Sequence, residues 1–353
     1  MNRYWTALAG ELTPYVPGEQ PRVADLVKLN TNESPYGPSP KAIAAVRASA
    51  ADTLRLYPDP EATELREALA AYHGVAASQV FVGNGSDEVL AHTFAALLNH
   101  ELPLVFPDVT YSFYPVYAKL TGVRFETVPL DPELRVRIED YRRPCGAVIL
   151  ANPNAPTGIV LDLAEIARLV DEHPDVPVVI DEAYIDFGGE SALKLLPGRP
   201  NLLVIRTMSK SRALAGLRVG YAIGDAGLVE ALVRVKDSFN SYPLGRPAQA
   251  GAAASVADEP YLQETVAKIV RSREAMTRGL TELGFVVPPS SANFVFARPP
   301  RLSGAEFTRA LRERRVLVRN FQKPRIADYL RISVGSDSDV AALLEACYRI
   351  LHT

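Results

Sequence analysis

Seven short apolar runs, separated by longer polar stretches, constrain the fold of this chain more than any other feature. They are QVFVGNG, LPLVFPD, RFETVPL, GAVILANP, VPVVIDEAY, NLLVIRTMSK and LRVGYAIGD. Most are rich in β-branched residues and bounded by Gly, Pro, Asp or Asn, which is typical of strands buried on both faces. Stretches with apolar residues at helical spacing, such as ATELREALAAYHG, lie between them. The alternation predicts a layered α/β domain over residues 30–245.

The pattern changes after residue 245. A long helical segment, YLQETVAKIVRSREAMTRGLTELG, is followed by three strand-like pieces, NFVFARP, VLVRNF and YLRISVG. Helices and strands segregated in this way predict a smaller α+β domain over residues 246–353. Residues 1–29 are too few for a domain, so we expect them to be an N-terminal segment that packs on the other two parts.

Composition narrows the class of protein. A chain of 353 residues with a net charge of −3 has no basic excess, so neither nucleic acid nor a membrane surface is an expected partner. The first residues lack the apolar core of a signal peptide, and no run reaches the ~18 apolar residues of a membrane span. The two cysteines cannot form a disulfide framework, and the five scattered histidines do not have metal-site spacing. We therefore expect a soluble, cytoplasmic protein without a bound metal.

The stretch RTMSKSRALAGLRVGYAIG (206–224) places one lysine among hydroxyls and cations. Lys210 directly follows a predicted buried strand, at the sheet edge where α/β proteins bind ligands. Thr207, Ser209 and Arg218 are near enough in sequence to bind a phosphate. A partly desolvated amine beside cations has a lowered pKa and is nucleophilic near neutral pH. The alternative is an exposed lysine in a polar turn.

A second candidate anion site lies in VFVGNGSDEVLAHTF (80–94). A predicted strand meets two glycines there, and Ser86, Asp87 and Glu88 open a helix whose first N–H groups can bind a phosphate. The third glycine of a dinucleotide fingerprint and the Gly-Lys-Ser/Thr of a P-loop are both missing. The alternative is an ordinary strand–helix turn in which Ser86 is the N-cap.

Two further motifs also follow predicted buried strands. VVIDEAYIDF (178–187) ends its strand in Asp181, a carboxylate that is costly to bury unless a cation pairs with it. A protonated ring nitrogen would serve, and the alternatives are a neighbouring arginine or a helix cap. LANPNAPTGIV (150–160) places Asn152 and Asn154 in a proline-rich turn, where such side chains often bond their own backbone. The shared position of these motifs at strand exits predicts that they converge.

NPNAPTG, DEAY, SK and LAGLRVGY, in this order, resemble the pyridoxal-phosphate-dependent aminotransferases of fold type I. LNTNESPYGPSP, YPDP, GNGSDE and YLRISVG resemble more narrowly the histidinol-phosphate aminotransferase family. The resemblance extends from about Tyr15 to the C-terminus. It implies a large, mixed but mostly parallel sheet sandwiched by helices, a smaller α+β domain, and pyridoxal 5'-phosphate as cofactor.

The resemblance also implies roles for individual residues. Lys210 would bind the cofactor covalently and move a proton, and Asp181 would keep the cofactor's ring nitrogen protonated. Asn154 and Tyr184 would donate hydrogen bonds to the ring oxygen, and Tyr111 would stack on the ring face. The residues that would hold the cofactor phosphate are Gly85, Ser86, Asp87, Ser209, Arg218 and, from the neighbouring subunit of a homodimer with shared active sites, Tyr57.

Substrate binding is assigned to the smaller domain and the N-terminal segment. Arg331 shares a strand face with Tyr329 and Ser333, and Arg319 is the one cation in the apolar strand VLVRNF. Two guanidinium groups, with Tyr15 as a further donor and Asn154 nearby, suit the phosphate dianion of histidinol phosphate. The alternative for Arg319 is an ion pair with a protein carboxylate.

The implied reaction is transamination of L-histidinol phosphate with 2-oxoglutarate, giving imidazole acetol phosphate and glutamate in histidine biosynthesis. The chain departs from the family pattern at Arg212, where an aromatic residue is usual, and at Ser211, where alanine is common. Arg206 and Arg212 receive no role. The alternatives are an aromatic amino-acid (phenylalanine) aminotransferase, a phosphothreonine-type decarboxylase, and a non-catalytic regulatory protein, although the latter would be expected to have lost Lys210 or Asp181.

Overall fold

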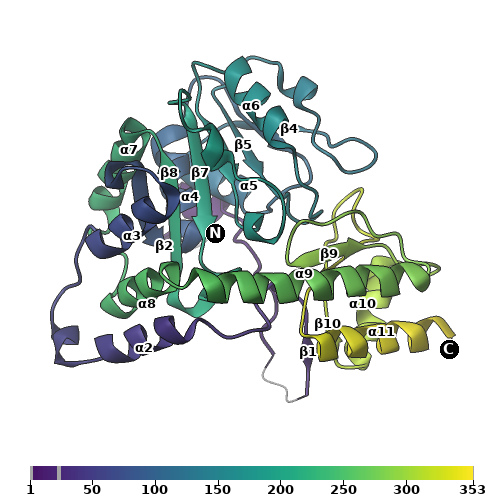
Figure 1. The fold of residues 1–353 in the computed structure, drawn as a ribbon. Coiled ribbons are helices and arrows are strands. Elements are labelled where there is room, and N and C mark those ends of the chain that lie inside the picture. Colours follow the sequence, from purple (N-terminus) through teal and green to yellow (C-terminus); the bar gives the residue numbers. More distant parts are fainter. Residues whose placement is uncertain (1–2, 22–24, 353) are drawn as a thin grey trace.

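The computed structural model describes residues 3–21 and 25–352, and a seven-stranded sheet forms its centre (Figure 1). The strands, in spatial order, are β2 (Val80–Asn84), β8 (Val219–Gly224), β7 (Leu202–Thr207), β6 (Val178–Asp181), β5 (Ala147–Ala151), β3 (Leu104–Pro107) and β4 (Phe125–Val128). Strand β8 runs antiparallel to β2 and β7, and the other pairings are parallel. Each strand lies within one of the seven apolar runs, so the predicted mixed, mostly parallel sheet is confirmed.

Helices cover both faces of this sheet, which explains why its strands are apolar on both sides. In β7, Leu203 and Ile205 face one core, while Leu202 and Val204 face the opposite one. The first core is closed by α4 (Gly85–Leu97), α5 (Tyr114–Thr121) and α7 (Ala226–Phe239). The opposite face is covered by α2 (Pro40–Ser49), α3 (Thr63–His73), α6 (Leu163–Glu172) and α8 (Arg246–Val256).

A second unit contains the remaining strands and three helices. Its antiparallel sheet has the order β11 (Arg319–Asn320), β12 (Leu330–Ser333) and β9 (Phe294–Ala297), and β1 (Val27–Lys28) pairs in parallel with β10 (Val316–Leu317). Its helices are α9 (Glu259–Glu282), α10 (Gly304–Glu313) and α11 (Asp337–His352). Leu330 and Ile332 of β12 are fully buried against these helices, so Arg331 and Ser333 project from the other side.

The packing of α8 bears on where the two units divide. Ala252, Ala253 and Val256 of α8 belong to the same core as β2 and β8, although the sequence assigns this helix to the smaller domain. Leu29, assigned to the N-terminal segment, lies in the core of the smaller unit. We therefore propose that the units divide between α8 and α9, the long helix that runs into the smaller unit (Figure 1).

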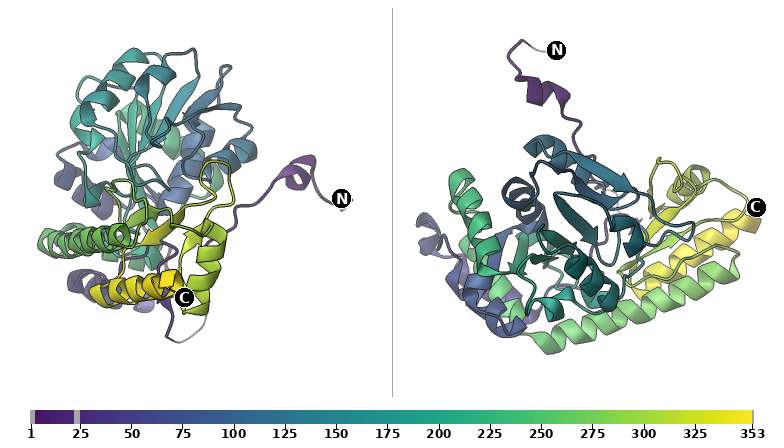
Figure 2. Two further views of the ribbon diagram at one scale, coloured as in Figure 1. Left: turned by 90° about the vertical axis from the view of Figure 1, so that its right-hand side faces the viewer. Right: turned by 90° about the horizontal axis from the view of Figure 1, so that it is seen from above.

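The N-terminal segment contains one short helix, α1 (Ala7–Glu11), which projects away from the body of the molecule (Figure 2). None of its residues is buried. Residues 1–2 and 22–24 of the predicted segment lie outside the described residues. Between them, the chain from Tyr15 onward returns to the body and reaches the cavity described below.

Helix α4 begins in close contact with strand β8, and this contact gives a testable prediction. A Cβ atom at Gly220 would lie 2.3 Å from the backbone nitrogen of Ser86 and 2.4 Å from the carbonyl carbon of Gly85. Gly220→Ala must therefore displace the first turn of α4, and we expect it to lower the free energy of unfolding by about 1–3 kcal/mol. Denaturant unfolding measures this loss.

Gly216→Ala is the matched control, because a Cβ atom there meets nothing within 4 Å. Its unfolding free energy should stay within about 0.5 kcal/mol of the parent. Equal stability of the two variants would contradict the close packing of α4 on β8.

Candidate active site

A cavity of about 810 Å³ lies at one edge of the central sheet. Strands β5, β6 and β7 end at this edge with Ala151, Asp181 and Thr207, which all line the cavity. Because β8 is antiparallel, it begins at the same edge, directly after Arg218. The sheet topology therefore brings together the exits of separate predicted strands, as expected for a ligand site in an α/β fold. The cavity also includes Tyr15, Pro17, Thr31, Asn32, Glu33, Ser86, Asp87, Tyr111, Tyr184, Ser209, Lys210, Arg319 and Arg331.

Lys210 lies in this cavity, three residues beyond the end of β7. Its ammonium nitrogen donates to the carbonyl oxygen of Thr31, at 3.2 Å. Burial lowers the pKa of Lys210 to about 8, and the nearby guanidinium of Arg331 acts in the same direction. Lys210 is therefore not an exposed lysine in a polar turn, and its lowered pKa makes the neutral, nucleophilic amine more accessible near neutral pH than in an ordinary lysine.

Asp181 is the buried carboxylate of the cavity. Its oxygens accept hydrogen bonds from the Tyr114 hydroxyl, at 2.9 Å, and from the backbone N–H of Ala183, at 3.2 Å. Burial raises the pKa of Asp181 to about 6. The ion pairs found among the described residues do not include Asp181, so the alternative of an arginine partner is wrong. A carboxylate in this position fits a cationic ring nitrogen.

One corner of the cavity is built to hold an anion. Arg218 donates to the Asp87 carboxylate at 2.8 Å and to the Ser209 hydroxyl at 3.4 Å, while Thr207 donates to Ser209 at 3.0 Å. The first turn of α4 adds backbone N–H groups that lack intrahelical partners. Gly85 has a φ of 78°, a conformation that other residues rarely adopt, and it lies directly against Arg218, because a Cβ atom there would be 2.4 Å from the guanidinium.

The interpretation of Ser86 as an N-cap is wrong. Helix α4 begins at Gly85, its N-cap residue is Asn84, and Ser86 is already inside the first turn. Ser86 lines the cavity instead. The sequence placed the helix start one residue too late because Gly85, with a φ of 78°, looks like part of the loop.

Two tyrosines, Tyr111 and Tyr184, also line the cavity. Tyr111 donates from its hydroxyl to Asp87 at 3.0 Å, and its ring stands edge-on to that of Tyr114. Tyr184 accepts a hydrogen bond at 3.0 Å from the side-chain amide of Asn32. Sequence reasoning missed Tyr114 and Asn32, although Tyr114 lies three residues after Tyr111 and Asn32 lies inside the motif LNTNESPYGPSP.

Two arginines face the cavity from the smaller unit. Arg319 and Arg331 are paired across the antiparallel strands β11 and β12. Arg331 donates to the carbonyl oxygen of Asn30 at 3.0 Å, and burial lowers its pKa. The hydrogen-bond partners described for Arg319 are the carbonyl oxygens of Val16 and Pro17, at 3.2 Å and 3.5 Å, and not a protein carboxylate. The two guanidinium groups thus remain available to an anionic ligand.

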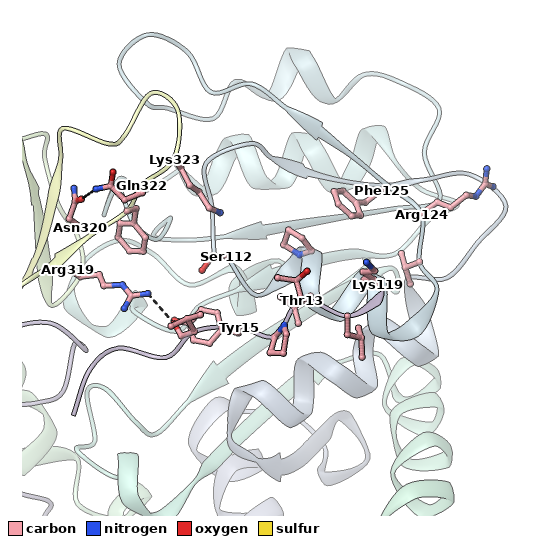
Figure 3. Close-up of a pocket in the computed structure, with 17 residues that line it drawn as sticks. Thr13, Tyr15, Ser112, Lys119, Arg124, Phe125, Arg319, Asn320, Gln322 and Lys323 are labelled. Carbon is pink, nitrogen blue, oxygen red and sulfur yellow. Dashed lines mark hydrogen bonds between the residues drawn. The ribbon is translucent and has the colours of Figure 1, made fainter. Parts of the chain in front are cut away.

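A second cavity of about 850 Å³ adjoins the first (Figure 3). Tyr15 and Arg319 line both cavities and lie between them. The Tyr15 ring stacks on Phe113 at a centroid distance of 4.6 Å. Tyr15 is therefore held by the large unit at the point where the N-terminal segment passes between the two cavities.

Three of the predicted site residues, Gly85, Asn154 and Tyr57, do not line the main cavity of this chain. The side-chain amide of Asn154 donates to the carbonyl oxygen of Val109 at 3.0 Å and to the Thr157 hydroxyl at 3.2 Å. Its role toward a cofactor would require one of these bonds to be given up. Tyr57 is 77% exposed and stacks on Tyr242 at 4.7 Å. The roles of Asn154 and Tyr57 stay predictions.

The unassigned arginines point away from the cavity. Arg206 forms an ion pair with Asp186 and lies 3.8 Å from Glu182. Arg212 lies 3.6 Å from Glu259, at the start of α9. Both are buried, and each balances carboxylates of the protein. The departure from the family pattern at Arg212 therefore adds no cation to the lining of the cavity.

The fold and this site together define a class of protein. A buried amine, a buried carboxylate without a cationic partner, and an anion-binding corner fit pyridoxal 5'-phosphate, which carries an aldehyde, a basic ring nitrogen and a phosphate. The sequence model of the family "Aminotransferase class I and II" matches residues 24–350. The chain therefore belongs to this family.

Individual relatives identify the branch of the family. The chain is 64% identical to histidinol-phosphate aminotransferase 2 of Rhizobium meliloti (strain 1021), over 99% of this chain and 100% of the relative. It is 61% identical to histidinol-phosphate aminotransferase 1 of Bradyrhizobium diazoefficiens, with the same coverage. The resemblance to the histidinol-phosphate aminotransferases is thus confirmed.

A solved structure confirms the fold type. Histidinol-phosphate aminotransferase from Sinorhizobium meliloti, in complex with pyridoxal-5'-phosphate, is similar with a TM-score of 0.87 and 27% sequence identity. The similarity covers 99% of this chain and 98% of that one.

The lowered pKa of Lys210 predicts how cofactor uptake depends on pH. Only the neutral amine attacks an aldehyde, so the rate at which cofactor-free protein takes up pyridoxal phosphate should rise with pH, with a midpoint near the Lys210 pKa of about 8. Stopped-flow absorbance in the visible range measures this rate. Arg331→Met removes a nearby cation and should move the midpoint upward. A parent midpoint near the ordinary lysine value of about 10.4 would contradict the prediction.

Proposed function

We propose that this chain is a pyridoxal-phosphate-dependent aminotransferase that transfers the amino group of L-histidinol phosphate to 2-oxoglutarate. The products are imidazole acetol phosphate and glutamate, and the reaction belongs to histidine biosynthesis. The observation that carries this proposal is a single cavity with Lys210 and Asp181 on one side and the Arg319–Arg331 pair on the other. The names of relatives that are 57–64% identical support the same substrate.

The residues of the cavity divide the binding of the cofactor between them. Bound pyridoxal phosphate supplies a protonated ring that withdraws the electron pair released at the substrate Cα. Asp181 holds the proton on the ring nitrogen, because a carboxylate buried this deeply gains most from a cationic partner. Ser209, Arg218 and the first turn of α4 hold the phosphate, and Tyr111 packs against the ring.

Lys210 is the proposed covalent anchor and proton carrier. Its amine would condense with the aldehyde carbon of bound cofactor, with loss of water, and would be released when the amino group of the substrate takes its place. The free amine would then take the proton from the substrate Cα and return it to the former aldehyde carbon of the cofactor, on the other side of the nitrogen that joins them. A pKa of about 8 suits both steps, because general acid–base groups work best when their pKa is near the working pH.

The substrate phosphate is assigned to Arg319 and Arg331. Both guanidinium groups reach the cavity, and each keeps N–H groups beyond those that bond the chain's own carbonyl oxygens. Two such groups match a phosphate dianion better than they match a single carboxylate. Tyr15, held against Phe113, adds a hydroxyl at the same end of the cavity.

We further propose that the enzyme is a homodimer in which Tyr57 reaches the phosphate corner of the partner. Exposed apolar side chains gather around Tyr57 in the single chain, as expected for a surface that a second copy covers. They are Leu54, Leu56 and Tyr57 itself, together with Tyr242, whose ring stacks on that of Tyr57. The backbone carbonyl of Tyr57 is fixed by Arg246 at 2.7 Å, so its side chain projects from an ordered loop.

The predicted cytoplasmic location stays part of the proposal. Both cysteines, Cys145 and Cys347, are buried and free. Within the described parts of the chain, the helices are too short or too polar to cross a membrane.

A half-reaction tests the proposed activity. Histidinol phosphate alone should remove the visible absorbance of the purified holoenzyme, and 2-oxoglutarate should restore it. Lys210→Ala should slow this exchange by at least roughly 10²–10⁴-fold, because it removes the proton carrier. Stopped-flow absorbance measures both steps. A higher kcat/KM for phenylalanine would instead support an aromatic amino-acid aminotransferase, and release of carbon dioxide without 2-oxoglutarate would indicate a decarboxylase.

Subunit mixing tests the shared active site. With limiting cofactor, the Lys210→Ala and Tyr57→Ala homodimers should both be nearly inactive. After subunit exchange in equal amounts, half of the dimers carry one intact site of two, so activity should recover to roughly one quarter of the parent value.

Lys210→Ala mixed with Asp181→Ala is the matched control. Both residues serve the same site of the same chain, so no mixed dimer has an intact site and activity should not recover. If the Tyr57→Ala mixture also failed to recover, Tyr57 would not act across the interface.

A further inference from the structure

Three consecutive residues, 30–32, contact three side chains to which the proposed function gives separate tasks. The carbonyl oxygen of residue 30 accepts a hydrogen bond from Arg331, and that of residue 31 accepts one from Lys210. The side-chain amide of residue 32 donates a hydrogen bond to Tyr184. The first two contacts are made by backbone atoms, which any residue type could supply. The third depends on asparagine, and Asn32 is 1% exposed.

Asn32 is held in place from several sides. Its φ of 56° is a left-handed conformation that asparagine tolerates better than most residues. Its backbone N–H donates to the Ser333 hydroxyl oxygen at 2.8 Å, and its carbonyl oxygen accepts from the Asn293 side chain at 3.0 Å. The side chain of Asn32 therefore has little freedom to turn away from Tyr184.

The network also fixes which end of the Asn32 amide faces Tyr184. The Ser333 oxygen accepts the Asn32 backbone N–H, so the Ser333 hydroxyl hydrogen is free to donate to the Asn32 side-chain oxygen, which lies 2.9 Å away. The opposite end, Nδ2, then points to the Tyr184 oxygen at 3.0 Å. An amide nitrogen can only donate. Tyr184 must therefore accept this bond.

We propose that Asn32 is a positioning residue for Tyr184. By occupying a lone pair of the phenol oxygen, it leaves the Tyr184 hydrogen to be donated into the cavity, toward the ring oxygen of the cofactor. The inference rests on the proposed function, because it assumes that the cofactor occupies this cavity. It assigns Asn32 a task that depends on its donor group and not on its packing.

The charge state of Tyr184 agrees with this task. Burial raises the pKa of Tyr184, while the Arg331 guanidinium and the Asn32 hydrogen bond act in the opposite direction. Tyr184 thus keeps its proton at neutral pH and can donate it in a hydrogen bond. Such a bond stabilises the ionised ring oxygen, so it lowers the pH at which the visible absorbance of the holoenzyme changes.

Asn32→Gly tests the proposal, because glycine accepts the left-handed conformation and removes the amide without adding charge. The midpoint of the visible absorbance change with pH should rise by roughly half a unit to one unit, the worth of one hydrogen bond. In a Tyr184→Phe background the same substitution should move the midpoint by less than about 0.2 unit, since its target is gone.

Asn293→Ala is the matched control, since it removes a hydrogen bond to the backbone of the same residue and leaves the Asn32 amide in place. Its midpoint should stay within about 0.2 unit of the parent. A shift as large as that of Asn32→Gly would mean that displacement of the segment sets the midpoint, and would overturn the proposal. Equal shifts of Asn32→Gly with and without Tyr184, or no shift, would overturn it as well.

Asn32→Asp keeps the experiment decisive if the glycine variant loses the cofactor. It retains the oxygen that accepts from Ser333 and replaces only the donor group. Its midpoint should rise further, and part of that rise should vanish in the Tyr184→Phe background, whereas an undiminished rise would contradict the proposal. No substrate enters these titrations, so their failure is separable from a failure of the half-reaction with histidinol phosphate.

Discussion

The burial of Asp181 is the constraint on which most of the site depends. A carboxylate at the end of a central strand, with only a tyrosine hydroxyl and one backbone N–H to stabilise it, has its pKa raised to about 6. It stays ionised at neutral pH at a cost that a cationic ligand can offset. The protein supplies its other cations elsewhere, with Arg218 at the anion corner and Arg331 on the substrate side. This distribution of charge favours one orientation of the proposed cofactor, with its ring nitrogen beside Asp181 and its phosphate beside Arg218.

Much of the large unit could be predicted because its signals are local. A buried strand in a covered sheet is apolar on both faces, so the strands through Asp181 and Thr207 stand out from the sequence as short continuous runs. The residues at the exits of parallel strands meet at a shared edge, and this rule placed Lys210 and Asp181 correctly in one cavity. The start of α4 was predicted one residue too late. Glycine is typical of loops, but Gly85 is the first residue of the helix.

The remaining contacts depend on residues that meet only after folding. Asn32 and Tyr184 are 152 positions apart, and neither segment contains a pattern that predicts their hydrogen bond. The same holds for Arg319, whose hydrogen bonds within the chain go to backbone carbonyl oxygens of the N-terminal segment and not to the protein carboxylate considered as an alternative. The packing of α8 on the large unit was also not predicted, because the apolar face of a helix does not indicate against which of two cores it will pack.

The buried position of Arg212 has a consequence for how this branch of the family can evolve. Arg212 lies over the Tyr72 ring at 5.1 Å and beside the Glu259 carboxylate, and the Tyr72 hydroxyl donates to the same carboxylate at 2.7 Å. The three groups thus contact one another, while Arg212 also donates to the carbonyl oxygen of Ser255 and Glu259 also accepts from Gln263. Loss of the Glu259 carboxylate removes the acid that balances the buried Arg212 guanidinium, and a buried charge without an opposite charge is costly. Positions 72, 212 and 259 are therefore expected to covary among relatives, with the acid at 259 retained wherever 212 is arginine.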